Sequence, residues 1–179
     1  MVQRTGRWWD WRRRASPLVV LGVIVAGAAA ATLILPSGRL HSSTSVSFTL
    51  LDGRTLNISE LRGKPVLVSF WATTCAPCVE ELPDLIELYR ELHPRGLELI
   101  AVAMPYDPPV YVQTFARERD LPYLVALDVE GKVWRAFEEV KFIPTVFLLD
   151  SQGEMISRQV GKLDAARTRR LLEPFLKQS

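Results

Sequence analysis

The chain has 179 residues, of which 48% are hydrophobic and 23% charged, and its 22 basic and 20 acidic residues give a formal net charge of +2. This composition excludes an intrinsically disordered chain, and two cysteines exclude a small scaffold held by several disulfides. Five of the basic residues and one acidic residue lie within residues 1–35, so the other 144 residues carry 17 basic and 19 acidic side chains. A body with that charge has no general affinity for a phosphate backbone, and we expect no nucleic-acid partner.

An uncharged apolar run from Leu18 to Leu35 follows five arginines at the N-terminus. A helix of these 18 residues spans about 27 Å, which is close to the thickness of a hydrocarbon core. The positive-inside rule predicts that residues 1–17 stay in the cytoplasm and that everything after Pro36 lies on the extracytoplasmic (periplasmic) side of the cytoplasmic membrane. A cleaved signal peptide is the alternative, because Ala26–Ala31 offers small-residue cleavage sites. The apolar run resumes after these alanines, which favours an uncleaved, single-pass transmembrane anchor.

The part of the chain after this segment is expected to consist of a polar linker, residues 36–45, and an α/β domain, residues 46–179. Alternating hydrophobic residues before the Asp52-Gly53 turn predict a hairpin over Phe48–Ile58. Apolar runs and helical spacing predict strands at Pro65–Trp71, Leu97–Met104, Leu124–Leu127, Thr145–Leu149 and Glu154–Val160, and helices at Ala76–Leu92, Val110–Arg119, Lys132–Phe137 and Asp164–Lys177. Strands that alternate with helices and end in a hairpin and a helix predict a three-layer α/β sandwich.

The only two cysteines, Cys75 and Cys78, lie between a predicted buried strand and a predicted helix. Pro77 suits the first turn of that helix, since its missing N–H would have no partner there. Cys75 then lies at the helix N-terminus, where free amides and the helix dipole favour a thiolate. Cys78, one turn further along, is less accessible but close enough to close a disulfide. The arrangement predicts thiol–disulfide exchange, in which one thiol attacks and the other resolves the mixed disulfide.

Two buried structural cysteines are the simplest alternative to a redox pair. A structural disulfide across so short a loop would constrain the unfolded chain little, so stability alone is a poor reason for the spacing. A zinc site would need two further ligands, whereas the only histidines, His41 and His93, lie in the linker and at the far end of the predicted helix. We therefore expect no metal and no cofactor besides the redox-active Cys75–Cys78 disulfide.

The segment VLVSFWATTCAPCVEELP, which begins at Val66 and includes Trp71, resembles the active-site region of the thioredoxin superfamily. More specifically, it is similar to the membrane-anchored TlpA/ResA-like thiol–disulfide oxidoreductases. Pro83 resembles the proline that kinks the active-site helix of that superfamily. Ile143-Pro144-Thr145 resembles the cis-proline loop that faces the cysteines, and residues 120–142 are similar to an insertion typical of TlpA-like members. The resemblance covers residues 44–177 and implies a thioredoxin-like fold.

Three positions near the cysteines bear on how far the resemblance extends. Thr74 stands where the family often has a tryptophan, which removes an aromatic platform beside the reactive sulfur. Ser69 stands where thioredoxins have a buried aspartate that exchanges protons with the inner cysteine. Glu81 matches a glutamate that often has this proton-exchanging role in TlpA/ResA-like proteins. Glu81 is also three residues after Cys78 and shares its helix face, so it could accept the Cys78 proton. The alternative is that Glu81 is an ordinary solvated helix glutamate.

The resemblance implies a protein-disulfide reductase that acts on protein substrates with disulfides and receives electrons from a membrane thiol–disulfide carrier. Haem-site cysteines of apocytochrome c and copper-site cysteines of an oxidase subunit are the candidate substrates, and we expect a monomer. A peroxiredoxin-like peroxidase would need a threonine or serine and a proline where Ala72 and Val68 stand. A thioredoxin-fold copper-binding chaperone would add a histidine to the two cysteines, and no histidine is near them in the sequence. Redox direction does not follow from sequence, because it depends on how well the thiolate is stabilised.

Overall fold

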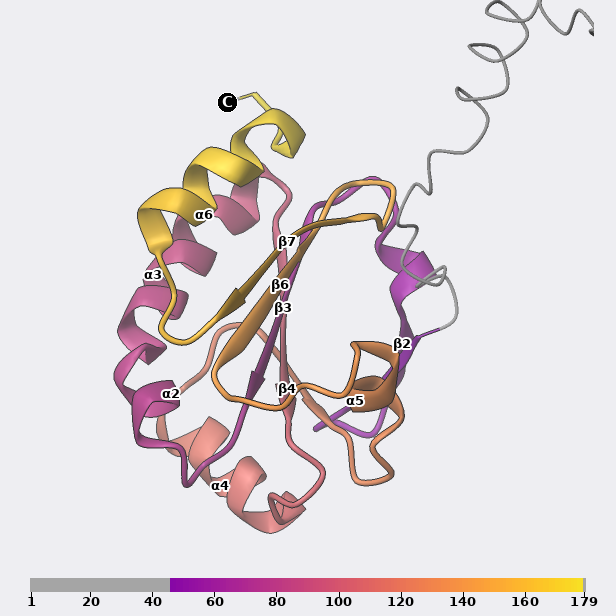
Figure 1. Ribbon diagram of the computed structural model, residues 1–179, viewed down its shortest axis with the longest axis vertical. Helices are drawn as coiled ribbons and strands as arrows, with labels where there is room; N and C mark the ends of the chain where they lie inside the picture. The colour runs from indigo at the N-terminus through magenta and orange to yellow at the C-terminus, as the bar shows by residue number, and fades with distance from the viewer. Residues whose placement is uncertain (1–45, 179) are drawn as a thin grey trace, which may run out of the picture. The chain divides into compact units, whose positions relative to one another are not determined.

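Seven strands form one mixed sheet in the computed structural model, which describes residues 46–178 (Figure 1). The strands are β1 (Ser47–Leu50), β2 (Thr55–Asn57), β3 (Val66–Trp71), β4 (Glu98–Ala103), β5 (Leu124–Leu127), β6 (Thr145–Leu149) and β7 (Met155–Val160). The helices are α2 (Ala76–Glu80), α3 (Leu82–Leu92), α4 (Pro109–Glu118), α5 (Lys132–Ala136) and α6 (Ala165–Leu172), with 3-10 helices η3 (Ile58–Leu61), η4 (His93–Arg95) and η5 (Glu173–Phe175). The predicted α/β class and the order of its elements are confirmed.

Strand pairing determines where the cysteine motif emerges from the sheet, whose order is β2-β1-β5-β4-β3-β6-β7. β3 runs parallel to β4, with Trp71 opposite Ala103, and antiparallel to β6, with Phe70 opposite Thr145. The C-terminal ends of β3 and β4 and the N-terminal end of β6 therefore meet at one end of the sheet. β1 and β2 form the predicted hairpin, and β5, which comes from the stretch 120–142, pairs with β1 and β4.

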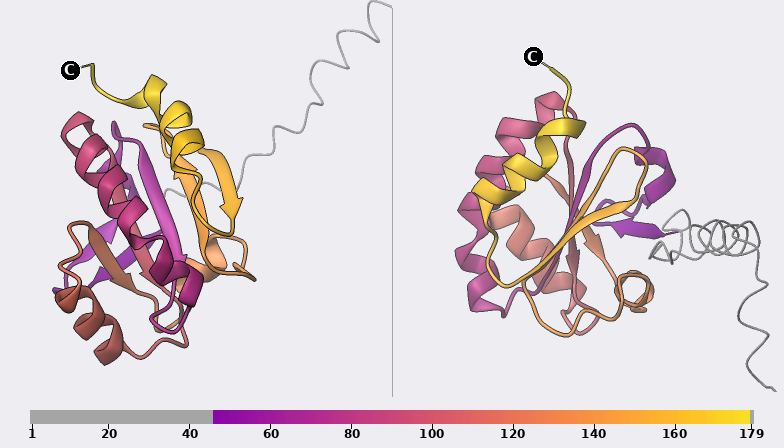
Figure 2. Two further views of the ribbon diagram at one scale, coloured as in Figure 1. Left: turned by 90° about the vertical axis from the view of Figure 1, so that its left-hand side faces the viewer. Right: turned by 45° about the horizontal axis from the view of Figure 1, so that its top comes forward.

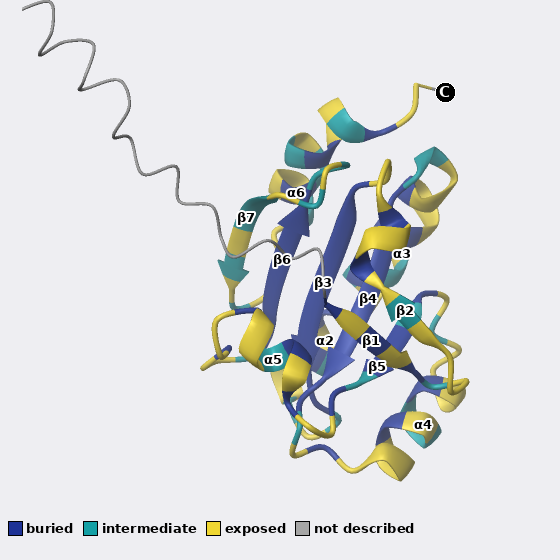
Figure 3. Ribbon diagram, turned by 90° about the vertical axis from the view of Figure 1, so that its right-hand side faces the viewer, coloured by how far each residue is buried: buried dark blue, intermediate teal, exposed yellow. Residues whose placement is uncertain are grey.

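Helices cover the two faces of the sheet unequally (Figures 1 and 2). The helices α2, α3, α4 and α6 lie on one face, and the shorter α5 and η3 lie on the other. Alternate residues of β3 supply both cores, with Leu67 and Trp71 facing the four helices and Val68 and Phe70 facing the opposite side. β3, β4 and β6 are buried along their whole length, whereas the edge strand β7 is partly exposed (Figure 3). The three-layer arrangement follows from this double burial.

A cluster of three phenylalanines fills the core on the α5 side of the sheet. Phe147 packs edge-on against Phe70, with ring centroids 5.8 Å apart, and against Phe137, with centroids 5.0 Å apart. Phe70 and Phe137 are themselves 5.5 Å apart. Such edge-to-face contacts add to the hydrophobic gain from burying each ring. The cluster connects β3 and β6, which flank the cysteine motif, to the segment after α5.

Two helices differ from the sequence-based expectation, and a proline accompanies each difference. The helix expected over 76–92 is broken at Glu81 into α2 and α3, because Pro83 has no N–H to donate to the preceding turn. This is the kink that the family resemblance implied. The helix expected to reach Lys177 ends at Leu172 and continues only as η5, in which Pro174 lies.

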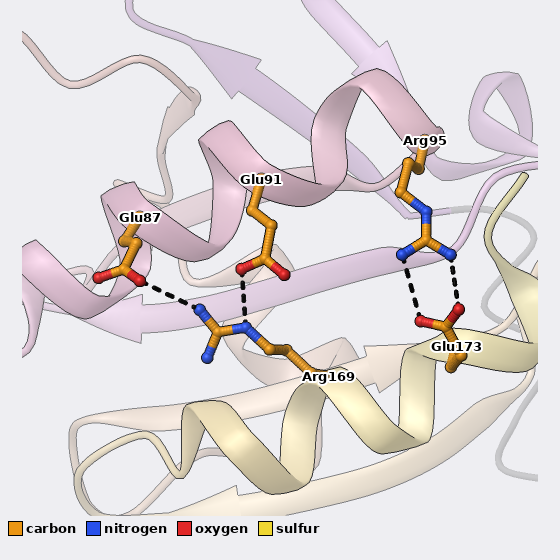
Figure 4. A network of polar contacts seen from close by, with 5 residues as sticks. All are labelled: Glu87, Glu91, Arg95, Arg169 and Glu173. Atoms are coloured by element: carbon orange, nitrogen blue, oxygen red, sulfur yellow. Dashed lines mark hydrogen bonds and ion pairs between the residues drawn. The ribbon is translucent and has the colours of Figure 1, made fainter. Parts of the chain in front are cut away.

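Ion pairs connect α6 and η5 to α3 and η4 on the outside of the domain (Figure 4). Arg169 reaches Glu91 at 2.7 Å and Glu87 at 3.4 Å, so one guanidinium bridges two carboxylates on successive turns of α3. Arg95 binds Glu173 through both of its terminal nitrogens, at 3.2 and 2.6 Å. Leu88 of α3 and Leu172 of α6 belong to one core cluster, so the ion pairs add polar contacts to helices that also share apolar packing.

The expected membrane anchor, residues 18–35, lies outside the described residues, as do the basic segment 1–17 and the linker 36–45. Within residues 46–178, no helix combines the length and apolar character that a membrane span requires.

Candidate active site

The two cysteines form a disulfide at the end of β3, with Cα atoms 5.3 Å apart. Cys75 is the N-cap residue of α2, and its sulfur accepts a hydrogen bond from the Cys78 N–H at 3.3 Å. Pro77 lies in the first turn of the helix, as predicted, where its missing N–H costs no hydrogen bond. Cys75 is half-buried, whereas the Cys78 side chain is only 2% exposed. One sulfur is therefore accessible at a helix N-terminus, and its partner is enclosed by the core.

The peptide bond between Ile143 and Pro144 is cis, as the family resemblance implied. Because Phe70 is opposite Thr145 in the antiparallel ladder, Pro144 lies beside Trp71, close to the point where the cysteine motif leaves β3. The Pro144 carbonyl accepts a hydrogen bond from the Gly161 N–H at 2.8 Å. Ile143 is half-buried, packs against both halves of the core as Cys75 does, and lies before the first residue of the strand ladder. The loop and the cysteines thus share one end of the sheet.

Glu81 lies at the junction of α2 and α3 and is completely buried. Its Oε2 atom accepts a hydrogen bond from the Leu163 N–H at 2.9 Å, and its Oε1 atom has no hydrogen-bond partner among the described residues. Burial raises the pKa of Glu81 to about 7; the negative charge of Asp84 adds to this, and the Leu163 N–H and Lys162 oppose it. The interpretation of Glu81 as a solvated helix glutamate is therefore wrong, because the helix glutamates Glu80 and Glu87 are exposed and Glu81 is completely buried.

Three further polar groups are buried without a hydrogen-bond partner among the described residues. They are the Ser69 hydroxyl, the Trp71 indole N–H and the Tyr123 hydroxyl. Trp71 is 3% exposed and packs against Phe115 with ring centroids 5.2 Å apart. Burial, and secondarily the charge of Glu81, raises the pKa of Tyr123. Glu81 is therefore near a phenol that sequence reasoning did not identify, since Tyr123 follows α4 and no local pattern connects it with the cysteines.

The segment between β3 and Cys75 is held by a residue that sequence reasoning also missed. Asp107, in the loop after β4, accepts hydrogen bonds from the Thr73 N–H at 2.6 Å and from the Thr73 hydroxyl at 2.7 Å. Asp107 is only 5% exposed, although Thr74 beside its partner is exposed. The predicted alternation of strands and helices was the signal that pointed toward Asp107, because residues that follow adjacent parallel strands meet at the same end of a sheet.

Comparisons with known proteins agree with this geometry. The Redoxin family matches residues 36–172. The thiol-disulfide oxidoreductase ResA of Bacillus thuringiensis subsp. konkukian is 32% identical over 130 residues, which cover 73% of this chain and 72% of the relative. The protein of the same name from Geobacillus kaustophilus is 35% identical over 133 residues, which cover 73% of this chain and 75% of the relative.

Solved structures show the same fold. StoA from Bacillus subtilis superposes with a TM-score of 0.60 at 25% identity, over 70% of this chain and 94% of its own. A thiol:disulfide interchange protein of the thioredoxin family from Chlorobium tepidum superposes with a TM-score of 0.66 at 26% identity, over 73% of this chain and 92% of its own. The chain therefore belongs to the Redoxin family and is a thiol–disulfide oxidoreductase of the ResA type, with a thioredoxin-like fold and a Cys75–Cys78 pair.

Proposed function

We propose that the chain is an exported disulfide reductase that its N-terminal segment holds in the cytoplasmic membrane, with the catalytic domain on the extracytoplasmic side. The arginines before Leu18 and the apolar run to Leu35 support this topology. The observation that carries the proposal is the asymmetry of the pair, in which Cys75 is accessible at the start of α2 and Cys78 is enclosed. A protein substrate can contact the Cys75 sulfur, and the enclosed Cys78 sulfur can then resolve the mixed disulfide and release the substrate.

In the first step, the Cys75 thiolate attacks one sulfur of a substrate disulfide. A bond forms between Cys75 and that sulfur, the substrate S–S bond breaks, and the other substrate sulfur leaves as a thiolate. The free amides at the start of α2 stabilise the attacking thiolate, and the Cys78 N–H already contacts the Cys75 sulfur. We assign to the backbone of Ile143, which lies outside the strand ladder, the pairing with an extended substrate segment.

In the second step, the Cys78 thiol transfers its proton to the Glu81 carboxylate, and the resulting thiolate attacks the Cys75 sulfur of the mixed disulfide. The substrate leaves with its second sulfur reduced, the Cys75–Cys78 disulfide re-forms, and two electrons have passed to the substrate. A carboxyl whose pKa is raised to about 7 is suited to accept a proton near neutral pH. Cys78 and Trp71 are buried in the same core cluster, so this step takes place on a sulfur with little exposure to water.

The proposed substrates are proteins at the same membrane whose paired cysteines must be reduced before a cofactor is bound. Haem-site cysteines of apocytochrome c and copper-site cysteines of an oxidase subunit fit this description, and the resemblance to TlpA/ResA-like proteins supports them. A membrane thiol–disulfide carrier would return two electrons to Cys75 and Cys78, and we propose that the chain acts as a monomer.

The reduction potential of the full-length chain tests the direction of transfer. A value near that of thioredoxin, about −270 mV, supports a reductase, and a value near about −120 mV would show an oxidant instead. A reporter that is active only outside the cytoplasm, fused after Ser179, should be active. The N-terminus of the exported protein should still lie within residues 1–17, whereas an N-terminus near Ala31 would show a cleaved signal peptide.

A further inference from the structure

We propose that Asp107 is a positioning residue of the exchange reaction, which holds the segment that ends in the attacking Cys75. Both oxygens of its carboxylate are used, Oδ2 by the Thr73 N–H at 2.6 Å and Oδ1 by the Thr73 hydroxyl at 2.7 Å. Hydrogen bonds to a carboxylate are the stronger class, and this carboxylate is almost completely shielded from water. Asp107 therefore fixes the residue two positions before the nucleophile from a separate loop.

The segment from Ala72 to Cys75 needs such a contact, because it belongs neither to the sheet nor to the helix. At its start, the Trp71 carbonyl accepts a hydrogen bond from the Met104 N–H at 2.9 Å, which continues the pairing of β3 with β4. At its end, the Cys75 N–H donates to the Ala72 carbonyl at 3.1 Å, which closes a tight turn. Between these two contacts, the Asp107 carboxylate is the group that binds Thr73. Without the Asp107 contact, the position of the reactive sulfur relative to the sheet would depend on the backbone turn between Ala72 and Cys75.

Exchange between disulfides is sensitive to such a change, because the attacking sulfur must approach in line with the bond that breaks. A displacement of the order of 1 Å can cost about a hundredfold in rate when orientation is part of catalysis. A small alkylating reagent needs no such alignment with a protein surface. The ratio of the exchange rate to the alkylation rate of Cys75 therefore separates positioning from a general loss of reactivity.

Asp128 provides a matched control within the same chain. It follows β5, the next parallel strand, is also 5% exposed, and accepts hydrogen bonds from the Val133 N–H at 3.1 Å and the Trp134 N–H at 2.7 Å. These bonds cap α5 and involve no residue of the cysteine segment. Asp107→Asn and Asp128→Asn thus remove the same charge and weaken the same kind of contact. The first substitution affects the segment before Cys75, and the second affects the start of α5.

The experiment uses the reduced full-length chain, with insulin as the protein disulfide and iodoacetamide as the small reagent. For Asp107→Asn we expect the ratio of exchange to alkylation to fall by at least about tenfold, and for Asp128→Asn to stay within about twofold of the parent chain. Loss of the nearby negative charge alone would favour the Cys75 thiolate and raise both rates, so it cannot produce this fall. An unchanged ratio in Asp107→Asn, or an equal fall in both variants, would overturn the proposal.

Variants of Thr73 test the same contact without a change in charge, and they decide the question if Asp107→Asn does not fold. Thr73→Val loses the hydroxyl donor and should lower the ratio of exchange to alkylation severalfold. Thr73→Ser keeps the donor and should keep the ratio of the parent chain. A Thr73→Val chain with the parent ratio would show that the contact does not position Cys75, and would overturn the proposal. Equal loss in Thr73→Ser and Thr73→Val would do the same, because the hydroxyl would then be irrelevant.

Discussion

Glu81 and Leu163 are 82 residues apart in the sequence, and the Leu163 N–H donates a hydrogen bond to the Glu81 Oε2 atom at 2.9 Å. The bond ties the break between α2 and α3 to the segment that connects β7 with α6. The other carboxylate oxygen has no hydrogen-bond partner among residues 46–178, so the charged form of Glu81 is only partly compensated inside the core. This is the physical reason that its pKa lies near neutrality.

The pH dependence of stability should reveal this carboxyl in the oxidised chain, in which the cysteines do not titrate. Between the ordinary pKa of a glutamate, 4.5, and about 7, the folded chain holds the Glu81 proton and the unfolded chain does not. The free energy of unfolding should therefore fall as the pH rises through this interval, by on the order of 3 kcal/mol from this group. Urea unfolding of the parent chain and of Glu81→Gln at a series of pH values measures the difference.

Glu80→Gln is the control for that series, because Glu80 is the exposed neighbour of Glu81 on the same helix. Its unfolding curve should follow the parent chain at every pH. If the difference between the parent chain and Glu81→Gln is constant from pH 4.5 to 8, Glu81 does not titrate in this interval, and its proposed role as acceptor of the Cys78 proton loses its support.

The two thiols of the reduced chain should differ in reactivity. Cys75 is half-buried at the start of α2 and Cys78 is 2% exposed, so alkylation at about pH 6 should modify Cys75 at least tenfold faster. Peptide mass spectrometry after limited alkylation gives both rates. Cys78→Ser should accumulate mixed disulfides with protein substrates, and Cys75→Ser should not. Equal labelling of the two thiols, or faster labelling of Cys78, would contradict this assignment.

Phe147 should dominate the stability of the core on the α5 side. It is fully buried and touches both Phe70 and Phe137, so Phe147→Ala should lower the free energy of unfolding by about 3–5 kcal/mol. Phe142→Ala is the matched control, since that ring is 72% exposed, and its effect should stay within about 0.5 kcal/mol. Similar losses in the two variants, measured by urea unfolding, would contradict the packing described.

The ion pair of Arg95 with Glu173 should stabilise the folded chain at low salt, and this stabilisation should be lost at high salt. Arg95→Met should lower the urea midpoint at low ionic strength, and the difference should shrink at about 1 M salt, where the screening length is about 3 Å. Arg90→Met removes the same charge from an exposed arginine for which the structure shows no ion pair within residues 46–178. A loss in Arg95→Met that does not respond to salt would indicate packing of the side chain instead.

The order of strands and helices could be predicted because local sequence patterns indicate each element. The apolar run of β3, the Asp52-Gly53 turn and Pro77 in the first turn of α2 each reflect a preference of a few adjacent residues. The redox pair could be predicted for the same reason, since its two members and the helix that activates them are contiguous in sequence. The cis Ile143–Pro144 bond required the resemblance to a known family, because the residues alone allow either form.

The environment of the site could not be predicted, because it is made by contacts between distant segments. Helix spacing placed Glu81 on the face of Cys78, but whether that face met solvent depended on where the segment around Leu163 packed. The bond between Asp107 and Thr73 depended on β4 lying parallel to β3 in one register. Tyr123 came near Glu81 only because β5 takes its place in the sheet between β1 and β4.

The turn between β6 and β7 lies at the opposite end of the sheet from the sulfurs, since β6 runs antiparallel to β3. The Ser151 carbonyl accepts a hydrogen bond from the Gly63 N–H at 2.8 Å, and Gln152 at the tip is exposed. Exposed turn tips are among the parts of a domain that best tolerate added residues. A fluorophore or an affinity tag introduced after Gln152 would therefore leave the substrate side clear, which makes this turn the natural handle for immobilising the protein while electrons are exchanged at its other end.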